Sequence, residues 1–491
     1  GDVYKRQALA LFSAEVSAET IYQDSFELCR VPDVVEWDGG GDGKSWWDPL
    51  NWQGDQVPVD GDAVAIREPD SLTVEYGGLT TTLSCLGSTA NLTMINGTLV
   101  LDGPATVTAN FTIQNGRTTV NKRLVVNGDL DLRLGTLDGA GTVTVYGPFT
   151  WSGGSQAGLG ETIADGGLLI NGANGKNLSE RTLTLNDVSS WTGSGDLTLR
   201  WGATINVNAS FDIATDADMS HIQGGNPFMK INGSLTKSSG TGLTIIGSEF
   251  SNTGSIAVNT GQLSFIPGGI PAPRNSSGEF TVESGSTLAV RANHTFEASS
   301  SFSGAGGYVQ EGGVAVMQGN FALTGPLEVS GGTLQFPASP VLAGDVTISG
   351  GDLELPSGAS VGGDVILNSG ELLVSGPVTI AGALQQAPTG TLNGTATVTV
   401  DGLFSWTGGN QRGLGETIAN GGAEISGANA KDLRERTLTL NGATSWTGNG
   451  PLTLRFGPVI NVNAPFDIAT DANMDALQGA WGIMNPVSYT H

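Results

Sequence analysis

Residues 90–132 read ANLTMINGTLVLDGPATVTANFTIQNGRTTVNKRLVVNGDLDL, and the spacing within this stretch decides the fold. Short segments of alternating apolar and polar residues start 19 residues apart, at Ala90, Ala109 and Gly128. Glycines keep the same spacing at Gly97, Gly116 and Gly135. A period this short holds neither a pair of helices nor a four-stranded blade, but it suits one coil of a β-solenoid.

Each coil is expected to contain two or three strands of about four to five residues, with side chains that alternate between inside and outside. Leu92, Phe111 and Leu130 then point inward and stack on one another along the axis. Gly, Asn and Asp between the strands suit tight corners because they tolerate a positive φ. The same spacing returns later in the chain, at Gly325, Gly344, Gly363 and Gly382.

The composition agrees with an all-β fold and limits the partners. Of 491 residues, 75 are glycine, 14% are charged and 38% are hydrophobic. Short Val, Ile, Leu and Thr runs recur between turn residues, which distinguishes the chain from a disordered one. The net charge of −26 repels nucleic acids and anionic membranes, so neither is an expected partner. The sequence has no apolar run of about 18 residues or more, and it therefore predicts no transmembrane segment.

The pattern divides the chain into five parts. Residues 1–18 combine residues that resemble translated sequencing-adapter remnants with the end of a secretory signal peptide, which predicts export. A linker is expected at 19–36, a Trp- and Gly-rich cap at 37–70 and the solenoid at 71–485. Residues 486–491 again resemble adapter sequence and are interpreted as a non-native tail.

The chain has two cysteines, Cys29 and Cys85. An exported protein can join them in one disulfide that ties the N-terminal segment to the solenoid, and two free thiols are the equal alternative. The sequence does not choose between these two states.

A much longer repeat overlies the coils. Residues 136–223 and 391–478 align without gaps at an offset of 255 residues and agree at 59 of 88 positions. Such identity indicates a duplicated module that lengthens the solenoid. The offset pairs large aromatic residues for which we expect structural roles: Trp151 with Trp406, Trp191 with Trp446, and Phe211 with Phe466.

Four of the ten tryptophans gather near the start of the chain, at Trp37, Trp46, Trp47 and Trp52. Aromatic side chains can cover the apolar end of the first coil, so we interpret this segment as a cap. An alternative for the Asp and Gly residues among them is a Ca²⁺ loop with Asp38 and Asp42 as ligands. This loop lacks the remaining ligands of that motif, and the fold requires no cofactor.

Two stretches resemble known families. The Trp- and Gly-rich segment, which ends in Asn51-Trp52, Pro58 and Asp62-Ala63-Val64-Ala65-Ile66, resembles the start of many autotransporter-like and other exported bacterial β-helix proteins. The duplicated block is similar to repeats in large bacterial exoproteins of the adhesin or hemagglutinin type. The residues that carry this similarity include Phe149-Thr150-Trp151, Gly158-Leu159-Gly160-Glu161-Thr162-Ile163-Ala164 and Trp191-Thr192-Gly193. The resemblance implies a right-handed parallel β-helix, because the period alone permits either hand.

Seven charged residues occur at matched positions in both modules: Glu161/Glu416, Lys176/Lys431, Glu180/Glu435, Arg181/Arg436, Arg200/Arg455, Asp212/Asp467 and Asp216/Asp471. A catalytic groove is normally built once, so we interpret these charges as ion pairs between coils or as turn hydrogen bonds, and we expect no catalytic residues. The histidines show no zinc pattern. His221 is replaced by Ala476 in the second module, and His294 and His491 stand alone.

Expected export, coil periodicity and module duplication lead to one main hypothesis. The chain is a secreted or cell-surface adhesive β-solenoid, associated with the outer membrane, that presents a repetitive surface to a host or neighbouring cell, to matrix or to glycans. One alternative is a polysaccharide-active β-helix enzyme, a lyase or glycoside hydrolase, whose acidic residues would converge on one lateral groove. Another alternative is a passive spacer within a larger exoprotein.

Overall fold

The computed structural model describes residues 33–268, 273–477 and 482–486. The adapter-like and signal-like residues 1–18, most of the expected linker, Cys29 and most of the expected tail lie outside these residues. Cys85 is buried, and its pairing with Cys29 stays a prediction. The chain divides into two compact units, residues 1–189 (unit 1) and residues 190–491 (unit 2).

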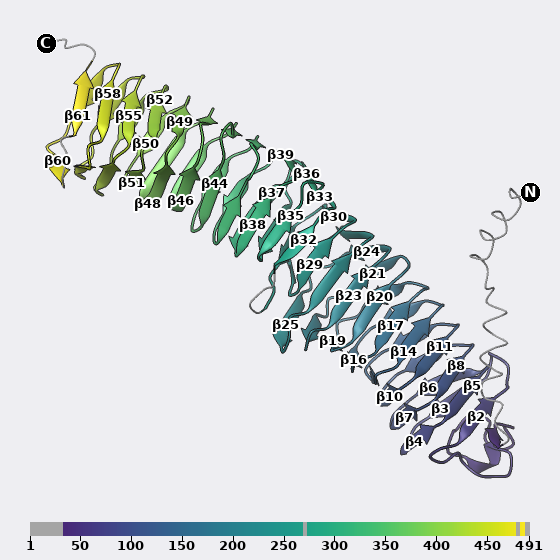
Figure 1. Cartoon of the computed structure of the whole chain (residues 1–491). Helices are drawn as coiled ribbons and strands as arrows, with labels where there is room; N and C mark the ends of the chain where they lie inside the picture. Colours follow the sequence, from purple (N-terminus) through teal and green to yellow (C-terminus); the bar gives the residue numbers. More distant parts are fainter. Residues whose placement is uncertain (1–32, 269–272, 478–481, 487–491) are drawn as a thin grey trace, which may run out of the picture. The chain divides into compact units, whose positions relative to one another are not determined.

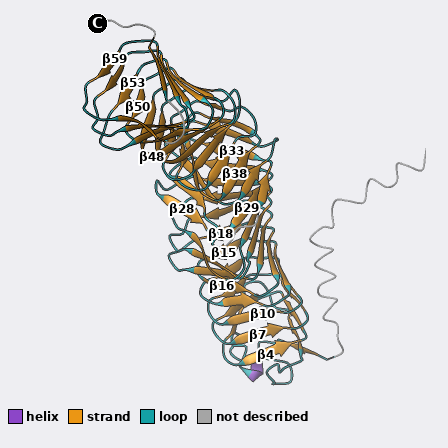
Figure 2. Cartoon of the chain, turned by 60° about the vertical axis from the view of Figure 1, so that its left-hand side comes forward, coloured by secondary structure: helices purple, strands orange, loops and turns teal. Residues whose placement is uncertain are grey.

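Each unit is a parallel β-solenoid in which successive coils place their strands on three faces (Figure 1). Short loops join the strands, and the only helix in the described residues is the single turn Pro49–Asn51, purple in Figure 2. These features confirm the predicted all-β parallel β-helix, while its handedness stays a prediction. No helix in the described ranges is long and apolar enough to cross a membrane.

In unit 1, neighbouring strands on a face belong to consecutive coils. Face 1 contains β1 (Val34–Glu36), β2 (Ala63–Ile66), β5 (Cys85–Ser88), β8 (Pro104–Val107), β11 (Arg123–Val126), β14 (Thr142–Val145), β17 (Glu161–Ala164) and β20 (Thr182–Leu185). Face 2 contains β3 (Thr73–Tyr76), β6 (Asn91–Met94), β9 (Phe111–Ile113), β12 (Leu130–Leu132), β15 (Phe149–Trp151) and β18 (Leu168–Ile170). Face 3 contains β4 (Thr80–Leu83), β7 (Thr98–Leu101), β10 (Arg117–Val120), β13 (Thr136–Asp138), β16 (Gly154–Ala157) and β19 (Lys176–Ser179).

In unit 2, β46 (Val365–Val374) and β48 (Leu384–Gly394) are long and run across two faces, called faces 4 and 5. Besides these two, face 4 contains β22 (Leu197–Arg200), β25 (Met219–Gln223), β28 (Leu243–Ile246), β31 (Gln262–Phe265), β34 (Thr287–Arg291), β37 (Gly307–Gly312), β40 (Leu327–Val329), β43 (Val346–Ile348), β50 (Phe404–Trp406), β53 (Ala423–Ile425), β56 (Thr444–Trp446) and β59 (Phe466–Ile468).

Face 5 contains β23 (Thr204–Val207), β26 (Phe228–Ile231), β29 (Glu249–Asn252), β32 (Arg274–Ser276), β35 (His294–Phe296), β38 (Val314–Met317), β41 (Thr333–Gln335), β44 (Asp352–Leu355), then β46 and β48, and β51 (Gly409–Arg412), β54 (Lys431–Arg434), β57 (Leu452–Arg455) and β60 (Met474–Leu477). Face 6 contains β24 (Ser210–Ile213), β27 (Ser234–Lys237), β30 (Ser255–Val258), β33 (Glu279–Val282), β36 (Ser301–Gly304), β39 (Asn320–Leu323), β42 (Val341–Leu342), β45 (Ser360–Val361), β47 (Val378–Ile380), β49 (Thr397–Val400), β52 (Glu416–Ala419), β55 (Thr437–Leu440), β58 (Val459–Val462) and β61 (Ile483–Pro486). The remaining strand, β21 (Ser189–Trp191), spans the boundary between the units.

The predicted inward ladder is confirmed on face 2. Leu92, Phe111 and Leu130 pair in register and are at most 1% exposed. A hydrogen bond between coils also supports the regular spacing. The Oδ1 atom of Asn110 accepts it from the backbone N–H of Asp129, one coil further on, at 2.8 Å. Gly116 has a φ of 77°, and a Cβ there would lie 2.6 Å from the carbonyl oxygen of Gly97, so this corner requires glycine.

The period is less uniform than predicted. On face 2, Leu92 pairs with Phe111 at the predicted spacing, whereas on face 6 the register partner of Ser210 is Ser234, which lies beyond that spacing. The strands of this coil, β24, β25 and β26, have four or five residues, and most of the additional residues lie in the corners. Corner length therefore varies while the stacked core is preserved.

Residues 34–61, which comprise β1 and most of the expected cap, cover one strand on each face of unit 1, namely β2, β3 and β4. β1, which lies in the segment expected as a linker, pairs with β2. Ser45 bridges to Glu75 in β3, and the backbone N–H of Gly61 donates to the carbonyl of Thr82 in β4 at 2.8 Å. The open edges that would otherwise template pairing with another chain are thereby satisfied.

Aromatic packing completes the cap. Trp37, Trp46 and Trp52 are at most 4% exposed. The ring of Trp52 packs edge to face against Trp37 and Trp46, with centroid distances of 4.9 and 4.8 Å, and its Nε1 donates to the Trp46 carbonyl at 2.7 Å. Trp47 is half-buried beside Tyr76, at a centroid distance of 5.8 Å.

The duplicated aromatic residues occupy the core with one exception. Trp151, Trp191, Phe211, Trp406 and Trp446 are at most 2% exposed, but Phe466 is only half-buried. Phe211 is covered by Leu235, its register partner in the next coil. No strand follows β59 on face 4 in the described residues, so Phe466 has no such cover.

Candidate functional site

A shallow polar groove of about 760 Å³ follows the corner between faces 1 and 2 of unit 1. Its lining comes from four consecutive coils and includes Arg67, Glu68, Asp70, Thr89, Asn91, Thr108, Asn110 and Asn127. Hydroxyl and amide groups dominate this lining. Two small residues, Ala109 and Gly128, also line the corner and leave space above the backbone.

Unit 2 has a comparable groove of about 560 Å³ at the corner between faces 5 and 6. It is lined by Ala209, Gly233, Ser234, Thr253, Gly254, Ser255, Ser277, Gly278, Glu279, Ser299 and Ser301. A second hollow of about 510 Å³ lies further along the same corner and adds the apolar side chains of Phe321, Phe336 and Pro340. The corner therefore offers hydroxyl groups over several coils, followed by an apolar stretch.

The carboxylates proposed for Ca²⁺ take part in the turns of the cap. Asp38 Oδ1 accepts from the backbone N–H of Gly40 at 3.1 Å, and Asp42 Oδ1 accepts from Lys44, Ser45 and the Asn51 amide at 2.7–2.9 Å. The backbone N–H of Ser45, with the Asn51 and Lys44 donors, lowers the pKa of Asp42. Within 33–268, 273–477 and 482–486, no group of three or more His, Cys, Asp or Glu side chains is placed to hold a metal. Ca²⁺ binding at Asp38 and Asp42 stays a prediction.

The buried arginines are the most informative of the duplicated charges. Arg181 is fully buried in unit 1, and its five N–H donors reach Thr162 Oγ1 and the carbonyls of Gly139, Gly141, Ala157 and Glu161 at 2.7–3.3 Å. Arg436 in unit 2 makes the same five contacts at the duplicated positions, at 2.9–3.4 Å. Burial lowers the pKa of each guanidinium to about 10, so both stay charged at neutral pH. Each arginine ties three consecutive coils together.

Other repeated charges also have structural contacts. Lys176 and Lys431 are fully buried and donate to the carbonyls of Asn174 and Asn429 at 2.8 and 2.9 Å. Glu161 Oε1 accepts from Thr184 at 2.6 Å. Glu416 accepts a hydrogen bond from Thr439, and Arg455 pairs with Asp432 at 3.0 Å. Glu180 and Glu435 adopt positive φ angles of 62° and 61°. Of the remaining duplicated residues, Asp467 is exposed and Asp212 is half-buried.

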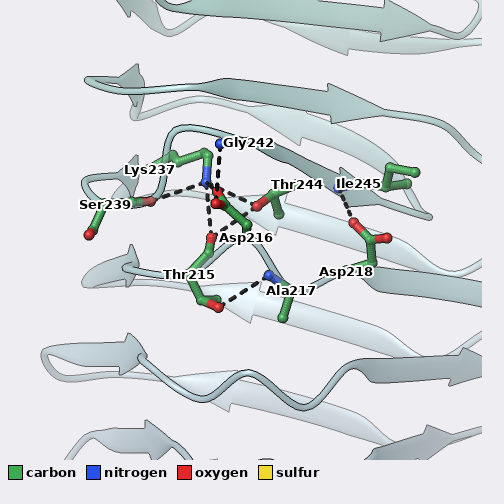
Figure 3. A network of polar contacts seen from close by, with 9 residues as sticks. All are labelled: Thr215, Asp216, Ala217, Asp218, Lys237, Ser239, Gly242, Thr244 and Ile245. Atoms are coloured by element: carbon green, nitrogen blue, oxygen red, sulfur yellow. Dashed lines mark hydrogen bonds and ion pairs between the residues drawn. The ribbon is translucent and has the colours of Figure 1, made fainter.

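Lys237 of unit 2 organises a polar network around Asp216 (Figure 3). Its Nζ is fully buried and donates to Asp216 Oδ1 at 2.8 Å, to the carbonyls of Thr215 and Ser239 at 2.9 and 3.1 Å, and to Thr244 Oγ1 at 3.1 Å. The hydrogen bond from Lys237 is the main cause that lowers the pKa of Asp216. Because its contacts hold the corner after β27, we assign this network to the fold.

A carboxylate cluster lies on the outer surface of face 5. Asp352 and Glu371 are register partners, and Glu371 accepts from Asn393 at 2.8 Å and pairs with Arg412. Burial raises the pKa of Asp352, and the charges of Glu371 and Glu354 raise it further. None of these residues lines either polar groove.

No family model, curated protein or solved structure matches this chain. Function is therefore inferred from the two grooves. The sequence identified no groove residue, since both grooves depend on the corner lengths of several coils together. The sequence does contain one indication of the unit 2 groove. Small hydroxylated residues recur at its corners, in the runs Ser276-Ser277-Gly278 and Ser299-Ser300-Ser301.

Acid should weaken unit 2 through His294. The imidazole is 2% exposed, contacts Ser276 Oγ at 2.8 Å and stacks on Phe250 at a centroid distance of 4.3 Å. Burial lowers the pKa of His294 to about 3 from 6.5, so the unfolded chain binds this proton more readily. The contribution of the neutral ring to stability is complete above pH 6.5 and decreases as the pH falls toward 3, by about 2–3 kcal/mol at about pH 4.5.

Urea unfolding at neutral and acidic pH, followed by hydrogen exchange in residues 249–317, tests this dependence. His294→Gln should remove most of the loss between the two pH values, because glutamine can still contact Ser276 but does not titrate. Equal losses in the variant and the original chain would contradict the assignment to His294.

Proposed function

We propose that this chain is a secreted or cell-surface adhesive β-solenoid, associated with the outer membrane, whose corner grooves bind polysaccharide chains without cleaving them. The observation that carries the proposal is the groove in each unit, which crosses consecutive coils and is lined by hydroxyl and amide groups. An elongated polymer with many hydroxyl groups matches both the length and the hydrogen-bonding character of such a groove.

Charge favours a neutral or weakly charged glycan over other polymers. The net charge of −26 repels nucleic acids and strongly anionic polysaccharides over long distances. The unit 2 groove holds one charged residue, the exposed Glu279, among serine and glycine residues. Its ligand is therefore recognised by hydrogen bonds and by shape, which suits weak contacts repeated along a chain.

Filling the grooves should weaken binding. Five polymers are immobilised on a surface: xylan, mannan and dextran, and the anionic pectin and alginate. We expect the full chain to bind at least one of the first three more tightly than either anionic polymer. A variant with Asn127→Trp and Ser299→Trp should bind about tenfold or more weakly, because one bulky ring occupies each groove. Thr379→Trp is the matched control, since Thr379 is an exposed outward residue of face 6 that lines neither groove.

Surface plasmon resonance of the three proteins decides the outcome, with circular dichroism to verify folding. Binding by the double variant equal to that of the original chain would refute the grooves as the site. A chain that binds none of the five polymers would refute the adhesive proposal and favour a spacer. Release of shorter products from any polymer would favour the enzyme alternative.

A further inference from the structure

Two exposed aromatic residues of unit 2, Trp201 and Phe456, occupy equivalent positions of the duplicated module. Their side chains are 48% and 45% exposed. This exposure departs from the pattern of the chain, in which Trp191, Trp406 and Trp446 are at most 2% exposed. Both positions therefore keep a large apolar ring in contact with solvent in each copy.

Both residues also hold a backbone conformation that disfavours them. The φ angles are 55° at Trp201 and 60° at Phe456, in the left-handed region that bulky residues rarely adopt. Glycine takes this conformation at the same corner position of nearby coils, at Gly224 with a φ of 88° and at Gly413 with a φ of 85°. Glycine would relieve the strain at both aromatic positions, and strain of this kind is typical of functional sites.

Each ring has a close neighbour, and charged groups lie near the ring of Phe456. The Trp201 indole lies against the backbone of Gly224, where an added Cβ would stand 2.3 Å from ring atom Cε3. At the other site, the Arg434 guanidinium lies 5.6 Å from the Phe456 ring centroid. This guanidinium lies over one face of the ring, and Asp432 pairs with both Arg434 and Arg455, at 3.6 and 3.0 Å, so charged hydrogen-bonding groups lie near Phe456.

We propose that Trp201 and Phe456 are two stacking sites for the sugar rings of glycan chains, which makes unit 2 bivalent. This inference rests on the proposed function, because it takes the same class of ligand. A pyranose ring has an apolar C–H face, which matches an exposed aromatic ring, and a rim of hydroxyl groups, which the charged groups near Phe456 can bind. A nucleobase could stack as well, but the net charge of −26 repels its phosphate backbone.

The two sites point in different directions because the module is not a whole number of coils. β22, which precedes Trp201, lies on face 4, whereas its duplicate β57, which precedes Phe456, lies on face 5. Along face 5, β57 follows β23 by twelve strand-to-strand steps, so the offset between the two modules spans twelve coils and one additional strand. Trp201 is consequently at the corner after face 4, and Phe456 is at the corner after face 5.

This geometry determines what two sites can do. At the spacing of neighbouring strands, twelve coils separate the sites by roughly 60 Å. Because they lie on different corners, they hold separate glycan chains and connect them. Only Phe456 lies at the same corner as the unit 2 groove, several coils further along, whereas Trp201 lies at a different corner.

The test uses the full chain with Trp201→Gly, Phe456→Gly and the double variant, and beads coated with xylan, mannan or dextran. Glycine relieves the strained backbone, so all three variants should keep an unfolding midpoint equal to or above the original. Each substitution is also made in the chain whose two grooves are filled by Asn127→Trp and Ser299→Trp. In that background each single variant should still bind the beads but lose their aggregation about tenfold or more, because one remaining site cannot connect two beads. The double variant should bind more weakly than either single variant.

Leu414→Ala is the matched control, because Leu414 is an exposed apolar residue (75%) of the same corner as Phe456 but lacks the aromatic ring. It should aggregate the beads like the original chain. Undiminished aggregation by the double variant would overturn the two stacking sites and leave groove binding intact. A lower unfolding midpoint in the glycine variants would assign the rings a structural role instead. If the original chain binds none of the beads, both the stacking sites and the proposed function fail.

Discussion

Replacing Trp52 by alanine is expected to unfold the beginning of unit 1 and to make the chain self-associate. Trp52 is fully buried between Trp37 and Trp46 and donates a hydrogen bond to the Trp46 carbonyl. Removal of a buried tryptophan side chain costs about 3–5 kcal/mol, since the cavity collapses only in part. The loss falls on the segment that covers the first strands of three faces.

Unpaired backbone groups are the expected cause of this self-association. When residues 34–61 separate from the solenoid, β2, β3 and β4 expose rows of unpaired N–H and C=O groups, which add strands from other molecules. Hydrogen exchange of residues 33–83 should rise in the Trp52→Ala variant before that of later coils, and sedimentation should show higher-order species. Leu50→Ala is the control, since Leu50 is 53% exposed in the same cap and its truncation should change stability by less than about 0.5 kcal/mol. A monomeric variant with unchanged exchange would show that the aromatic cluster does not secure the cap.

The coil could be predicted from the sequence because its causes are local. Leu92 and Phe111 alternate with polar neighbours, so two-residue periodicity directs them inward, and the constant spacing aligns them. The glycine at Gly116 follows from its positive φ and from the close approach of Gly97. These features need only the residues of one coil and the next.

The grooves and the rotation of the module could not be predicted in this way. Ser210 pairs with Ser234 and Ser234 with Ser255, and these two spacings differ from each other, so the number of coils between distant positions cannot be counted from a fixed period. The offset between the modules spans twelve coils and one additional strand, and this one strand places Phe456 at another corner than Trp201. The hollow between corners likewise depends on loop lengths, which no apolar pattern records.

The contacts of the duplicated charges could be predicted only in part from the sequence. The repetition of Arg181 at Arg436 correctly suggested contacts between coils, but an ion pair at the surface was as plausible as a buried guanidinium. The structure shows the buried arrangement, with carbonyl oxygens as the main acceptors. Charge alone predicts exposure, whereas the acceptors that allow burial come from the two preceding coils, from Gly139 and Gly141 and from residues 157–162.

Truncation of the buried arginines should weaken one unit at a time. In Arg181→Ala, four carbonyls and one hydroxyl lose their donor in a site without solvent access, and we expect unit 1 to lose about 3–5 kcal/mol. Arg181→Lys should recover part of this loss, because an ammonium group has three donors where the guanidinium has five. Arg436→Ala should produce the same loss in unit 2, which gives an internal replicate of the measurement.

Hydrogen exchange resolves the two effects. Arg181→Ala should raise the exchange of amides at 139–162, and Arg436→Ala should raise that at 394–417, each without changing the other segment. Arg123→Ala and Lys230→Ala are matched controls in the respective units, since both residues are exposed and their truncation should change stability by less than about 0.5 kcal/mol. If both arginine variants exchange like the controls, the coils are held by their apolar ladders alone. If the two losses instead agree, the duplication copied a stabilising device together with the coils that it joins.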